Sequence, residues 1–125
     1  MQAIVATAVS VGAMDALWLS YRYAYHNELF KSIQNSKLQI RILPSILIYA
    51  LIPYAIYIWA IKDKKTFQEA AANGAIVGLI LYGFYDLTNY ATFNNWTLEM
   101  AITDTLWGTT VCALGAAVGF YFHTK

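Results

Sequence analysis

Charged side chains are scarce in this chain, and their scarcity excludes a water-soluble domain. Only 12% of its 125 residues are charged and 59% are hydrophobic, whereas a typical soluble domain is about 25% charged and about 45–50% apolar. A soluble domain this small needs a polar exterior, and the sequence holds too little polar material to build one. The sequence therefore predicts a single integral membrane domain over residues 1–125.

Further absences narrow the classes of function. The single cysteine, Cys112, excludes a disulfide framework and a cysteine-based metal site. The net charge is only +1 and no basic stripe is present, which speaks against nucleic-acid binding. The sequence motifs of nucleophile-elbow hydrolases, zinc proteases and Walker-type nucleotide binders are missing, and the two histidines are too few for a histidine-box iron site. The sequence therefore favours a protein that is not an enzyme and has no resident cofactor.

Apolar segments long enough to cross a membrane, which takes about 20 residues, make up most of the chain. In lipid every backbone polar group must be paired within the protein, so each segment should be a helix. The sequence thus predicts an all-α fold, a four-helix transmembrane bundle. The expected spans are residues 2–23, 42–61, 70–93 and 100–122.

The link between the first two spans and the second span itself carry their own signals. Leu29, Phe30 and Ile33 recur at helical spacing, which predicts a short helix at the membrane interface. Pro53 lies within the second span and should kink it. The two histidines, His26 and His123, lie near helix ends and are expected to be interfacial.

The orientation in the membrane is weakly specified. With four spans both termini share one side, and the eight Lys and Arg residues divide four and four between the sides, so the positive-inside rule gives no direction. The tight basic turn Lys62–Lys65 favours cytoplasmic termini. An antiparallel dimer of dual topology is the alternative.

Small residues recur at the spacing that lets helices approach closely. They form the motifs Gly74-x-x-x-Gly78 and Gly115-x-x-x-Gly119. These motifs serve either packing within one chain or dimerisation, and we favour internal packing. Because four helices alone barely enclose a cavity, we also expect a homo-oligomer.

Three carboxylates fall inside the expected spans, at Asp15, Asp86 and Asp104. Each costs at least about 2.5–3.5 kcal/mol in lipid unless it faces a partner or a cavity. Counting about 1.5 Å per residue places all three roughly 20–27 Å from the terminal side. We therefore expect them to converge in the half of the membrane nearest Trp96.

Each aspartate is followed three residues later by a polar or aromatic side chain on the same helix face. Arg22 lies two turns after Asp15 and is the expected counter-charge. The residues expected to bind a ligand or relay protons are Asp15, Trp18, Asp86, Asn89, Asp104 and Trp107, supported by Tyr85, Thr88, Trp96 and Gly108. The plain alternative is that these groups only lock helices together, with Asp104 as a helix cap.

Four sequence pieces resemble a known family. They are M-D-A-L-W-L (14–19), Y-D-L-T-N-Y-A-T (85–92), N-W-T (95–97) and D-T-L-W-G (104–108). Together they resemble the bacterial membrane-protein family known as domain of unknown function 2177, over nearly the whole chain. The resemblance implies a set of signature positions and no particular activity. Those positions are Asp15, Trp18, Asp86, Thr88, Asn89, Trp96, Asp104, Trp107 and Gly108.

The convergent aspartates point to a transporter or channel for protons, cations or a small polar solute. Three carboxylates also suit a hard cation such as Na⁺, Mg²⁺ or Ca²⁺. The alternative is a membrane protein without transport activity that binds a lipid, a pigment or a protein partner in the same pocket. An enzyme acting on lipid headgroups ranks last, because no nucleophile is evident. The expected partners are the bilayer, further copies of the chain and a small cationic or polar ligand.

Overall fold

The computed structural model describes residues 1–36 and 40–123, and in these residues every regular element is a helix. The elements are α1 (Gln2–Tyr21), α2 (Tyr23–Gln34), α3 (Ile42–Ile56) with a π-helical end (Tyr57–Ile61), α4 (Phe67–Thr92) and α5 (Leu98–His123). Four stretches are long and apolar enough to cross a membrane, namely Gln2–Tyr21, Ile42–Ile61, Phe67–Thr92 and Leu98–His123. The predicted all-α class and four spans are thereby confirmed. Lys37 and Lys125, which enter the charge count, lie outside the described residues.

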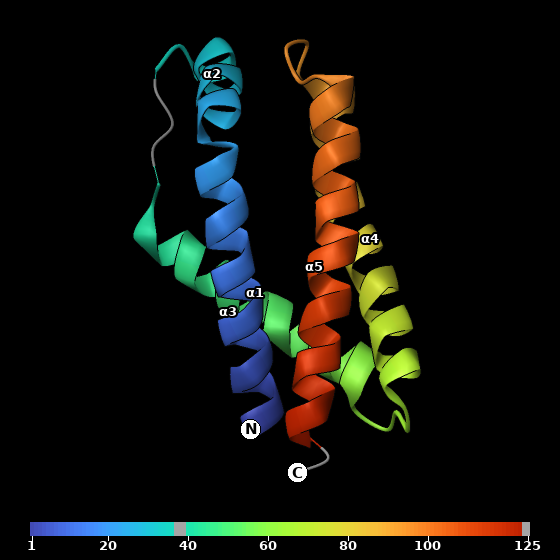
Figure 1. The fold of residues 1–125 in the computed structure, drawn as a ribbon. Helices are drawn as coiled ribbons and strands as arrows, with labels where there is room; N and C mark the ends of the chain where they lie inside the picture. Colours follow the sequence, from blue (N-terminus) through green and yellow to red (C-terminus); the bar gives the residue numbers. More distant parts are fainter. Residues whose placement is uncertain (37–39, 124–125) are drawn as a thin grey trace.

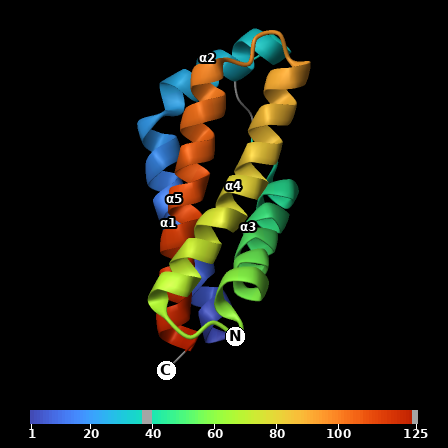
Figure 2. The same cartoon turned by 90° about the vertical axis from the view of Figure 1, so that its right-hand side faces the viewer.

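The helices form a bundle with two distinct ends. Both chain termini lie at one end, and α2 lies at the other, beside the turn that joins α4 to α5 (Figures 1 and 2). We call these the terminal end and the α2 end. Helix α3 runs obliquely behind α1, and its π-helical end reaches α4 and α5 near the terminal end (Figure 1).

Glycines bring α4 and α5 into backbone contact. A Cβ atom added to Gly74 would lie 2.5 Å from the carbonyl oxygen of Cys112, and one added to Gly78 would lie 2.2 Å from that of Gly108. Any side chain at these positions would push the two helices apart. The first glycine motif therefore packs α4 against α5, as small residues do between membrane helices.

The second motif packs α5 against α1. A Cβ atom on Gly115 would lie 2.6 Å from Val11, and one on Gly119 would lie 2.1 Å from the hydroxyl oxygen of Thr7. Thr7 also donates a hydrogen bond to the carbonyl oxygen of Gly115 at 3.2 Å. Both motifs thus act within the chain, which confirms internal packing.

Many large apolar side chains point outward, and small residues fill much of the interior. Leu17 and Phe84 are 73% and 76% exposed, whereas Ala60, Ala70 and Ala116 are fully buried. This arrangement suits a protein whose outer surface meets lipid and whose helices associate through close packing.

Helix α2 folds back onto the bundle. Leu29 is buried in a cluster with Trp96, Met100 and Ala101 of the α4–α5 turn and α5. Phe30 meets the Trp96 ring edge to face, with centroids 5.6 Å apart. The predicted short helix is confirmed, and it covers one end of the bundle.

The second span continues through its proline. Pro53 lies buried inside α3, and the helix ends in a π-helical turn where the Lys62 N–H donates to the Tyr57 carbonyl at 2.8 Å. A proline cannot donate to the carbonyl four residues earlier, here that of Tyr49. The helix changes from α to π geometry four residues after Pro53. This irregularity lies in the span where the proline predicts a kink.

Candidate functional site

Asp15 joins three helices through its carboxylate. One oxygen accepts a hydrogen bond from the indole N–H of Trp107 on α5 at 2.7 Å, and the other accepts from the hydroxyl of Tyr49 on α3. Trp18 stacks on Trp107 with ring centroids 4.8 Å apart and planes at 7°. The two D-x-L-W segments therefore meet, but Asp15 binds the tryptophan of the opposite helix and not Trp18 of its own.

Asp86 is placed differently. Its side chain is fully buried and faces Asp104 and Thr105 on α5. Within the described residues, neither carboxylate oxygen reaches a partner with hydrogen-bond geometry. Two acidic side chains, one on α4 and one on α5, therefore face each other inside the bundle, an arrangement that like charges disfavour unless a proton or a cation offsets them.

Asp104 lies at the centre of the charged groups. Its carboxylate interacts electrostatically with Asp86 on α4, Asp15 on α1, Arg22 and His26. Helix α5 begins at Leu98, so Asp104 lies beyond its first turn. The hydroxyl of Thr97 accepts the Met100 N–H at 3.0 Å and so caps the helix. Asp104 is not a helix cap, so this part of the plain alternative is wrong.

The aspartates come within electrostatic range of one another without forming a compact chelate. Among residues 1–36 and 40–123, no three His, Cys, Asp or Glu side chains gather closely enough to hold a metal ion. Both carboxylate oxygens of Asp15 accept hydrogen bonds, one from Trp107 and the other from Tyr49. Asp86 and Asp104 are therefore the carboxylates left to meet a ligand.

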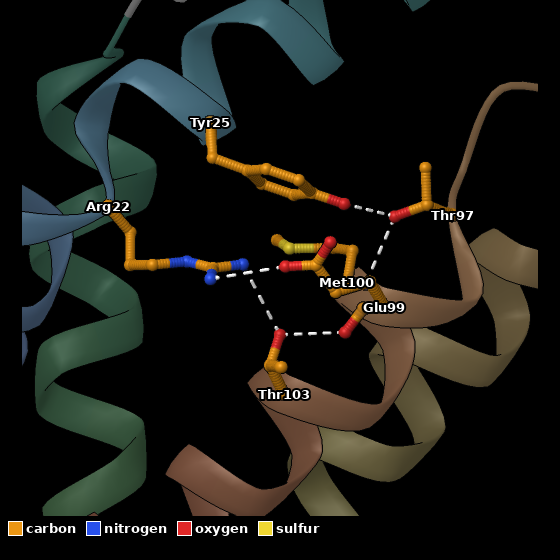
Figure 3. Close-up of polar contacts among 6 residues, drawn as sticks. All are labelled: Arg22, Tyr25, Thr97, Glu99, Met100 and Thr103. Atoms are coloured by element: carbon orange, nitrogen blue, oxygen red, sulfur yellow. Dashed lines mark hydrogen bonds and ion pairs between the residues drawn. The ribbon is translucent and has the colours of Figure 1, made fainter.

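Arg22 pairs with Glu99 and not with Asp15, the partner expected from helix spacing. Its guanidinium forms an ion pair with the Glu99 carboxylate at 3.3 Å and donates to the Thr103 hydroxyl at 3.4 Å (Figure 3). The reason is its position between α1 and α2, where it faces the first turns of α5. Figure 3 also shows the Tyr25 hydroxyl bound to that of Thr97. These contacts, which we call the α2 latch, hold α2 against α5.

His26 belongs to the site, although we expected it at the interface. It is 4% exposed, and its Nε2 atom has no hydrogen-bond partner among the described residues. Burial lowers its pKa, with a further contribution from Arg22, against the opposing influence of Asp104 and Asp15. A signal existed in the sequence, because His26 precedes Leu29, Phe30 and Ile33 by three, four and seven residues and so shares their buried face. Its burial follows from the way α2 folds back onto the bundle, and its position at the membrane interface stays a prediction.

Tyr49 was also missed as a site residue. It lies on α3, four residues before Pro53. Only the oblique course of α3 brings its hydroxyl to Asp15. Sequence offers no signal for that crossing.

The supporting residues have mixed roles. Tyr85 and Trp96 pack edge to face, 5.8 Å apart, and Asn89 neighbours Tyr85. Thr88 is exposed. A Cβ on Gly108 would lie 2.0 Å from the Tyr82 ring, so Gly108 serves packing between α4 and α5.

Unpartnered buried polar atoms accumulate at the α2 end. Besides the oxygens of Asp86 and Nε2 of His26, they are the indole nitrogens of Trp18 and Trp96 and Nε of Arg22, within the part of the chain that the structure describes. Native proteins contain few buried polar atoms without a hydrogen-bond partner, and each such atom needs an explanation. Their concentration makes the α2 end the candidate functional site.

Four membrane-length apolar helices with ionisable groups buried at one end define a multi-pass integral membrane protein. The family model described as "Predicted membrane protein (DUF2177)" matches residues 1–121, and the chain belongs to this family. The resemblance seen in the sequence is thus confirmed. No curated protein and no solved structure matches the chain.

Proposed function

We propose that this protein is a small membrane transporter that exchanges protons for a cation or a small polar solute at Asp86 and Asp104. The observation that carries the proposal is the fully buried Asp86 side chain, which faces a second acidic side chain, Asp104, with no cation among the groups that act on it in the described residues. Such a carboxylate needs either a proton or a positively charged ligand to offset its charge.

Exchange follows from competition for the same oxygens. A proton on Asp86 removes the charge that would attract a cation, and a bound cation favours the ionised form. Asp15 does not compete, because Trp107 and Tyr49 satisfy both of its oxygens. The transported solute would therefore meet Asp86 and Asp104, while Asp15 holds α1, α3 and α5 together.

The test is proton flux in proteoliposomes that contain a pH-sensitive dye. We expect the wild type to dissipate an imposed pH gradient in the presence of the solute, and Asp86→Asn and Asp104→Asn to lose this activity. Asp63→Asn is the matched control, because Asp63 is exposed in the turn before α4. Equal flux through the wild type and an Asp15→Asn, Asp86→Asn double variant would contradict a role for these carboxylates.

A membrane protein that binds a ligand without transporting it is the second candidate. The α2 latch favours it, because α2 covers the site and is held to α5 by side-chain contacts (Figure 3). The ligand would then be a lipid, a pigment or a protein partner. A copurified molecule found by mass spectrometry, together with no flux in liposomes, would support this candidate over the transporter.

A further inference from the structure

The unpartnered atoms at the α2 end include both hydrogen-bond acceptors and donors. The two Asp86 oxygens accept, whereas the indole N–H of Trp18 and that of Trp96 can only donate. Trp18 stacks on Trp107, which lies one helical turn from Asp104. A ligand that satisfies both kinds of atom must itself donate and accept hydrogen bonds.

The charges call for a positive ligand. Arg22 pairs directly with Glu99 and acts on Asp104 only at longer range, so neither Asp86 nor Asp104 forms an ion pair within the described residues. No three His, Cys, Asp or Glu side chains of the described residues gather to hold a metal ion, which favours an organic cation. An ammonium group needs fewer partners, because its N–H donors bind carboxylates directly.

Aromatic rings at the same end suit an organic cation. The Arg22 guanidinium already lies over the rings of Trp18 and Tyr25, 5.5 Å and 4.5 Å from their centroids. Tyr85, which packs against Trp96, lies within electrostatic range of Asp86 and Asp104. Such ring faces attract cations and accommodate the carbon atoms next to an amine.

From these observations we propose that the solute is a small protonated amine, primary or secondary, that also carries a hydrogen-bond acceptor such as a hydroxyl. The ammonium group binds Asp86 and Asp104, and the acceptor meets the indole N–H of Trp18. This inference rests on the proposed function, since it names the substrate class of the same site.

Ligand-dependent thermal stability of the purified protein in detergent tests the inference. The probes are ethanolamine, ethylamine, tetramethylammonium and sodium chloride, at equal ionic strength and neutral pH. We expect ethanolamine to stabilise the wild type at the lowest concentration, ethylamine at a higher one, and tetramethylammonium, which has no N–H donor, no more than sodium chloride. This order on the wild type alone needs no variant to fold.

Two variants locate the contacts. Asp86→Asn should weaken ethanolamine binding by about tenfold or more, the change expected from losing a charge-assisted hydrogen bond. Trp18→Phe should make ethanolamine and ethylamine equal, because it removes the N–H that meets the hydroxyl. The control Asp63→Asn should match the wild type. Equal effects of ethanolamine and tetramethylammonium, no effect of any amine beyond that of salt, or unchanged binding in Asp86→Asn would each overturn the inference.

Binding and flux separate this inference from the proposed function. Ethanolamine binding that depends on Asp86, with no proton flux in liposomes, would support the amine site and contradict transport. Proton flux that depends on Asp86, with no amine binding, would overturn the amine site and leave transport standing.

Discussion

The terminal end and the α2 end of this bundle are built on opposite principles. At the terminal end glycines and alanines bring backbones into contact, and the buried Thr7 hydroxyl is satisfied by the Gly115 carbonyl. At the α2 end large aromatic and charged side chains meet, and several buried polar atoms have no partner in the described residues. The difference indicates that the terminal end is built for close packing, whereas the α2 end, where we propose the binding site, departs from the rules that favour stability.

Gly78→Ala tests the packed end and should have the largest effect. The new Cβ would lie 2.2 Å from a backbone oxygen of Gly108, which cannot rotate away, so we expect a loss of about 3 kcal/mol in the free energy of unfolding. Gly12→Ala is the matched control, because nothing lies within 4 Å of its added Cβ. Thermal unfolding in detergent compares the two, and equal melting temperatures would contradict close packing between α4 and α5.

The two buried aspartates should respond to the same substitution with opposite signs. Asp15→Asn replaces a charged acceptor of two hydrogen bonds and should cost about 2 kcal/mol. Asp86→Asn removes the repulsion between two facing acidic side chains, Asp86 and Asp104, and should raise stability by about 1 kcal/mol. Denaturant titration in detergent measures both. Destabilisation by Asp86→Asn would mean that Asp86 is a structural anchor.

The α2 latch should depend more on aromatic contacts than on its ion pair. Glu99 is 56% exposed, and exposed ion pairs contribute little, so Glu99→Gln should cost about 0.5 kcal/mol or less. Arg22→Ala also removes the cation–π contacts of the guanidinium with the rings of Trp18 and Tyr25. It should lower the free energy of unfolding by about 1 kcal/mol. Thermal unfolding of both variants checks the order, and a larger loss in Glu99→Gln would reverse this account of the latch.

The sequence predicts how deep a residue lies along the helix axes, but not which residues of neighbouring helices it contacts. Hydropathy locates the spans, and residue counting places Asp15, Asp86 and Asp104 at a common depth, because a helix rises by a fixed distance per residue. The rotation and crossing of helices are not encoded in that count. Asp15 therefore meets Trp107 and Tyr49 and not Trp18, and Arg22 meets Glu99.

The direction in which a linking helix turns is a second limit. The apolar stripe of α2 predicts a buried face, yet lipid and protein both satisfy such a face. The stripe alone does not tell whether α2 faces lipid or packs on the bundle. In the structure Leu29 and Phe30 contact Trp96, so α2 packs on the bundle and carries His26 to the candidate site.

His26 offers the smallest predicted effect and the most direct probe of the α2 end. Burial lowers its pKa below 6.5 in the folded protein, with a contribution from Arg22 on the α1–α2 junction, while Asp104 on α5 and Asp15 on α1 oppose the shift. The folded state thus binds a proton less readily than the unfolded state, so the contribution of His26 to stability is present above pH 6.5 and is lost as the pH falls below that value. We expect the melting temperature in detergent to fall with acidification in this range, and the fall to be smaller in His26→Gln. His123→Gln, at the terminal end, should keep the wild-type profile. Superimposable profiles of the wild type and His26→Gln would show that the neutral imidazole contributes nothing to the stability of the α2 end.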